Sequence, residues 1–75
     1  MAEMLQFVRP DESLDPEALV ILCTAYDRAI RAIEVMQDGR TSDIVREIIA
    51  GRIIYAGRRG ERDPDTLRKL ALRDI

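Results

Sequence analysis

The sequence predicts an all-α fold, a three-helix domain with one long helix and two shorter ones. Asp15-Pro16-Glu17 and Asp63-Pro64-Asp65 each place a capping Asp before a Pro at the first helical position, with an acid in the first turn. Thr41-Ser42-Asp43 supplies a third start between them, and Gly39 and Gly60 lie where the first two helices are expected to end. No segment alternates polar and apolar residues with the period of a strand.

The length and composition indicate a single small domain. The 75 residues are 47% hydrophobic and 35% charged, with a formal net charge of −2, which is a globular mixture. We expect residues 15–75 to form the three-helix domain and residues 1–14 to form an N-terminal arm, since Pro10 disfavours helix at the residue before it. The apolar arm residues, among them Phe7 and Val8, are expected to dock on a groove of this chain or of a partner subunit.

The first helix, expected over residues 16–37, is apolar over an arc of about 200°, against roughly 100° for an ordinary surface helix. Two short helices can cover only part of such an arc. Small residues spaced four and then three apart also form a seam that another helix can approach closely. We therefore expect a subunit interface on this helix, formed by Ala25, Ala29, Ala32, Ile21 and Met36.

The second helix is expected over residues 43–58, with Ile54 and Ala50 pointing away from its main apolar face. That face is predicted to contain Ile44, Val45, Ile48, Ile49, Ile53, Tyr55 and Ala56. The third helix is expected over residues 64–74, with a stripe formed by Leu67, Leu70 and Ala71.

Arg52 falls in the middle of the apolar face of the second helix. Burying an unpaired guanidinium is costly, so this side chain must reach water or a carboxylate. One interpretation is a structural ion pair with an acid of the first helix or of a partner subunit. The other is a contact with a partner or an anion, for which the candidates are Arg52, Arg59 and Arg62.

The charge distribution leaves a nucleic-acid interpretation open as an alternative. Residues 1–43 carry nine acids and four bases, whereas residues 44–75 carry five acids and eight bases. The arginine-rich second half, read as a helix–turn–helix, could contact phosphates. However, Glu61, Asp63 and Asp65 lie at the start of the third helix and would repel phosphate, so we expect no nucleic-acid partner.

The residue types present exclude several kinds of site. The chain has no His, and Cys23 is its single cysteine, so neither a zinc site nor a disulfide within the chain is expected. No nucleophile, acid–base pair or phosphate loop emerges, and we expect no catalytic residue, cofactor or metal. No apolar run is long enough to span a membrane. The first residues lack a basic signal region, so the cytoplasm is the expected location.

The segment Arg52-Ile53-Ile54, followed by Gly60-Glu61-Arg62-Asp63-Pro64 and a last helix, resembles a pattern in short bacterial helical proteins with no established activity. Leu14-Asp15-Pro16-Glu17, followed by an alanine-rich helix, resembles the opening of those proteins. The resemblance covers residues 14–72 and implies a small helical domain. It carries no catalytic residue over to this chain.

Size favours self-association. A chain this short buries only roughly 60–65% of its unfolded surface, and small scaffolds usually need disulfides, a metal or oligomerisation. We therefore predict a homo-oligomer, in the first place a helical-bundle dimer, that acts as an interaction, accessory or regulatory module with a possible protein partner. The alternative is a small nucleic-acid-associated regulator that uses the arginine-rich second half.

Overall fold

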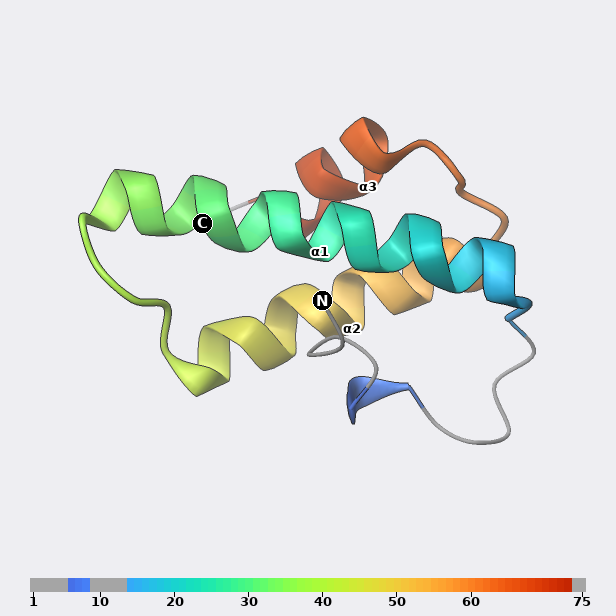
Figure 1. Ribbon diagram of the computed structural model, residues 1–75, viewed down its shortest axis with the longest axis horizontal. Helices are drawn as coiled ribbons and strands as arrows, with labels where there is room; N and C mark the ends of the chain where they lie inside the picture. The colour runs from blue at the N-terminus through green and yellow to red at the C-terminus, as the bar shows by residue number, and fades with distance from the viewer. Residues whose placement is uncertain (1–5, 9–13, 74–75) are drawn as a thin grey trace.

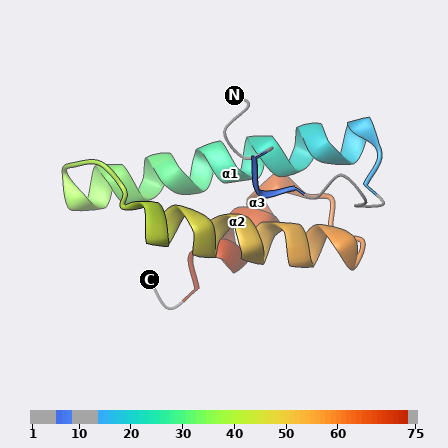
Figure 2. The ribbon, with the colours of Figure 1, turned by 90° about the horizontal axis from the view of Figure 1, so that it is seen from below.

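A computed structural model of the chain describes residues 6–8 and 14–73. These residues contain the helices α1 (Pro16–Gln37), α2 (Asp43–Arg58) and α3 (Pro64–Ala71), and no strand. Figure 1 shows α1 and α2 running side by side in opposite directions, and Figure 2 shows α3 lying against both. The predicted all-helical class is confirmed. The bounds of α1 and α2 are those expected, whereas α3 ends at Ala71 and is three residues shorter than expected.

All three helices begin with the caps that the sequence indicates. The Asp15 carboxylate accepts from the backbone N–H of Ala18 at 2.7 Å, and the Ser42 hydroxyl accepts from that of Val45 at 3.3 Å. Asp63 accepts from both the backbone N–H of Thr66 (3.2 Å) and its hydroxyl (2.8 Å). Each cap satisfies an N–H group that has no partner inside the helix.

The helix ends agree with the sequence only in part. After α2, Gly60 adopts a left-handed φ of 104°, and the Glu61 N–H returns to the Ala56 carbonyl at 3.1 Å, as expected for a glycine stop. After α1, by contrast, the left-handed residue is Asp38 (φ 54°), not Gly39. Asp tolerates this conformation better than most residues because its short polar side chain bonds locally.

One core joins the three helices. Its largest fully buried side chains are Tyr26, Leu22, Ile33, Ile49, Ile53 and Leu67. Helices α1 and α2 pack tightly at Gly57, where an added Cβ would lie 2.7 Å from a terminal carbon of Leu22. The absence of a side chain at Gly57 therefore leaves room for Leu22.

The orientation predicted for α2 was wrong in part. Ile49, Ile53 and Ala56 are buried as expected, but Ala50 and Ile54 are buried too, whereas Ile44, Ile48 and Tyr55 are exposed. Because α2 contacts both α1 and α3, its buried face is rotated by about 110° around the helix from the expected one. The single broad face expected from the sequence combines two separate apolar faces, one buried and one open.

The α1–α2 loop is held by a polar cluster. The Glu34 carboxylate accepts from the Thr41 backbone N–H (3.4 Å) and from the Arg46 guanidinium (3.3 Å), which also donates to the Thr41 carbonyl (3.2 Å). The Thr41 side chain is buried beneath this cluster, and its hydroxyl oxygen has no hydrogen-bond partner among the described residues.

The described part of the expected arm contains a short 3₁₀ turn at residues 6 and 7, followed by a bend at Val8. Phe7 and Val8 are partly buried against the core, and the rings of Phe7 and Tyr26 lie 6.3 Å apart. These two residues therefore pack on their own chain. The rest of the predicted arm, apart from Leu14, lies outside the described residues.

Candidate interaction surface

The outer face of α2 carries a row of exposed apolar side chains. Ile44, Ile48 and Tyr55 are 71%, 45% and 64% exposed, and Gly51 lies between Ile48 and Tyr55. The successive spacings are four, three and four residues, which place all four positions on one side of the helix. No atom lies within 4 Å of a Cβ built at Gly51, so the row has an open notch at its middle.

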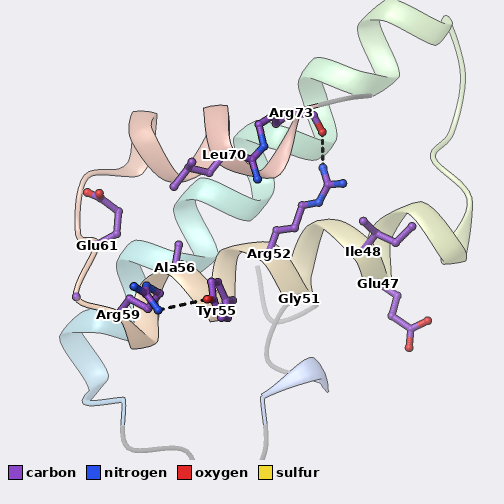
Figure 3. A pocket seen from close by; sticks show the side chains of 11 residues that line it. Glu47, Ile48, Gly51, Arg52, Tyr55, Ala56, Arg59, Glu61, Leu70 and Arg73 are labelled. Atoms are coloured by element: carbon purple, nitrogen blue, oxygen red, sulfur yellow. Dashed lines mark hydrogen bonds between the residues drawn. The ribbon is translucent and has the colours of Figure 1, made fainter.

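This row borders a groove of about 850 Å³ between α2 and α3. Ile48, Tyr55 and Ala56 of α2 and Leu70 of α3 supply its apolar lining (Figure 3). Charged groups of both signs lie around this lining, namely Glu47, Glu61, Arg52, Arg59 and Arg73. The groove thus combines an apolar floor with a polar rim, the usual composition of an interface.

The guanidinium of Arg52 finds hydrogen-bond partners that the sequence did not predict. Its guanidinium donates to the carbonyl oxygens of Ala71 (3.0 Å) and Arg73 (2.5 Å), and no carboxylate pairs with it among the described residues. Figure 3 shows the side chain crossing the groove from α2 to the end of α3. Arg52 therefore satisfies carbonyl groups left open at the C-terminal end of α3, where positive charge is favourable.

The other two candidate contacts differ from each other. Arg62 donates to the carbonyls of Gly57 (2.6 Å) and Glu61 (2.8 Å), so it closes the end of α2. Arg59 lies over the Tyr55 ring, 5.5 Å from its centre, and donates to its hydroxyl at 3.3 Å. Arg59 is exposed on the groove and can reach a partner, whereas Arg62 and Arg52 serve helix ends of their own chain.

Part of the interface expected on α1 lies in the core of the chain. Ala25 and Ala29 have no exposed surface, because the other helices of the same chain cover them. Ile21 and Ala32 are half-buried, and Met36 is 67% exposed near the end of α1. Ala25 and Ala29 thus serve packing within the chain and are not open to a second subunit.

The start of α3 is acidic, as expected. Hydrogen bonds from the hydroxyl and the backbone N–H of Thr66 lower the pKa of Asp63. Asp65 lies within ion-pair distance of Arg28 (3.4 Å) and Arg68 (3.9 Å). These acids occupy the helix N-terminus that a phosphate would use.

Cys23 supplies the single thiol of the chain. Cys23 is buried, and burial followed by the charge of Asp27 raises the pKa of its thiol, which keeps it in the unreactive protonated form. In residues 6–8 and 14–73, no three His, Cys, Asp or Glu side chains gather where a metal could bind. Within the same part of the chain, no helix combines the length and apolar character needed to cross a membrane.

Sequence reasoning missed the exposed position of Ile44, Ile48 and Tyr55 because it assigned them to the core. The signal that could have found them is their spacing around Gly51, which defines a face of its own about 110° around the helix from Ala50 and Ile54. Leu70, on the expected stripe of α3, is 36% exposed at the edge of the groove.

Comparison of the chain with protein-family models, with curated proteins and with solved structures finds no match.

Proposed function

We propose that this protein is a homo-oligomeric interaction module of the cytoplasm, a dimer in its simplest form, that acts as an accessory or regulatory protein through binding and not through catalysis. The observation that carries the proposal is the groove between α2 and α3, where Ile48, Tyr55 and Leu70 remain exposed in a 75-residue chain. Contiguous exposed apolar surface of this kind marks interaction sites.

The charges around the groove favour a second copy of the chain as the occupant. A two-fold interface uses the same patch on both subunits, so the patch must be complementary to itself. This rim carries both acids, Glu47 and Glu61, and bases, Arg52, Arg59 and Arg73. Each copy can therefore place its acidic groups against basic groups of the other while the apolar side chains are buried between them.

Charge placed in the groove tests the proposal directly. We expect the wild-type chain to associate between about 1 and 100 µM, the range of a weak to moderate dimer. Ile48→Glu buries a carboxylate in the apolar part of the interface and should raise the dimer dissociation constant at least about tenfold. Ile48 is exposed in the single chain, so this variant should remain folded by circular dichroism.

Met36→Glu is the matched control, because Met36 is similarly exposed but belongs to the interface expected on α1. Sedimentation velocity should show Met36→Glu associating like wild type. A wild-type chain that stays monomeric at about 100 µM would overturn the proposal. Loss of association in Met36→Glu but not in Ile48→Glu would transfer the interface to α1.

A further inference from the structure

We infer that the two copies pair through antiparallel α2 helices, with Ile44 of each lying opposite Tyr55 of the other and Ile48 lying opposite Gly51. This inference rests on the proposed self-association and adds its direction and register. The two-fold axis then passes between positions 49 and 50 of the paired helices.

The charge distribution along α2 sets the direction. Asp43 and Glu47 lie in its first half, where Arg46 is paired with Glu34 of α1 (3.3 Å), and Arg58 and the C-cap Arg59 lie at its end. In a parallel pair, like charges would meet at each end, whereas an antiparallel pair sets the acidic half of one helix beside the basic end of the other. Antiparallel helices also align their dipoles favourably.

The shapes of the side chains set the register. With Ile48 opposite Gly51 of the second copy, a branched side chain enters the open notch where no atom lies within 4 Å of the Cβ position. The same register brings Ile44 onto Tyr55, so every apolar position in the row finds a partner. In a parallel pair, two glycines would face each other and leave a gap between the Ile48 and Tyr55 layers, at a cost in packing.

Disulfide trapping distinguishes the two directions. Cys23→Ala removes the natural thiol, and Ile44→Cys and Tyr55→Cys are then made as separate single-cysteine chains, both at exposed positions. Positions 44 and 55 are eleven residues apart, about 16 Å along the helix, while a disulfide needs Cα atoms within about 7 Å. In the antiparallel pair, neither chain can therefore cross-link with itself, but an equal mixture of the two can.

We expect a cross-linked heterodimer in the oxidised mixture and only background in each chain alone. The background is set by mixing the Ile44→Cys chain with Val35→Cys, which places a thiol at an exposed position on α1. Cross-linking of either chain with itself would overturn the antiparallel direction. A mixture that sediments as a dimer when reduced but does not cross-link above background would overturn the register and leave the proposed dimer standing. A chain that sediments as a monomer would refute both.

Discussion

A methyl group added at Gly57 tests whether α1 and α2 pack as closely as the structure shows. Gly57→Ala should gain about 1 kcal/mol from helix propensity. Its Cβ, however, would lie 2.7 and 2.9 Å from the two terminal carbons of Leu22, which is itself fully buried and has little room to move. Overpacking of this kind costs about 1–3 kcal/mol. The net change should therefore lie between about zero and 2 kcal/mol of destabilisation.

Gly51→Ala is the control within the same helix. Nothing lies within 4 Å of a Cβ at Gly51, so this change should stabilise the chain by about 0.5–1 kcal/mol. Both are best measured by urea unfolding in the Ile48→Glu background, where association does not contribute. The difference between the two variants isolates the packing cost and should be about 1–3 kcal/mol. If Gly57→Ala stabilises as much as Gly51→Ala, the close approach at Leu22 is not present in the protein.

Two further predictions concern single polar groups. Thr41→Val removes a buried hydroxyl without a described partner and keeps the shape of the side chain. The free energy of unfolding should therefore rise by about 1 kcal/mol. An unchanged or lower value in urea unfolding would show that the hydroxyl is satisfied. The lowered pKa of Asp63 means that its ionised form stabilises the fold above the unfolded pKa near 4 and that this contribution is lost as the pH falls through the folded pKa. Asp63→Asn keeps a capping oxygen that does not titrate, so its melting temperature should fall less steeply than that of wild type between about pH 5 and 2; identical slopes would contradict the role of this cap.

The sequence could predict the helices because local chemistry decides where each one begins. Asp15, Ser42 and Asp63 each cap the helix expected from them. The end of α1 was harder to predict, because Asp38 adopts the left-handed conformation although the next residue, Gly39, would adopt it at less cost. Which of two neighbouring residues makes the turn depends on how the chain reaches α2, and that is a tertiary constraint.

The candidate site was less predictable because it depends on how the helices face one another. Ile44 and Ile54 are both isoleucines of α2, but one is exposed and the other buried, and the packing of the rest of the chain around α2 decides between them. The same holds for Arg52, whose partners are carbonyl groups about twenty residues further along the chain. The helical position of Arg52 shows that its charge needs a polar partner. It does not show that this partner is a backbone carbonyl at the end of a distant helix.

The most direct measurement of the central claim is a dilution series followed on the glycine amides. The chain has four glycines, and their amide signals can be followed by ¹⁵N-resolved NMR from about 1 mM to 10 µM, which brackets a weak dimer. Gly51 and Gly60 line the groove, whereas Gly39 follows the end of α1. Self-association through the groove predicts that the Gly51 and Gly60 signals shift with concentration while Gly39 stays fixed. Signals that do not change with dilution, or a shift confined to Gly39, would contradict it.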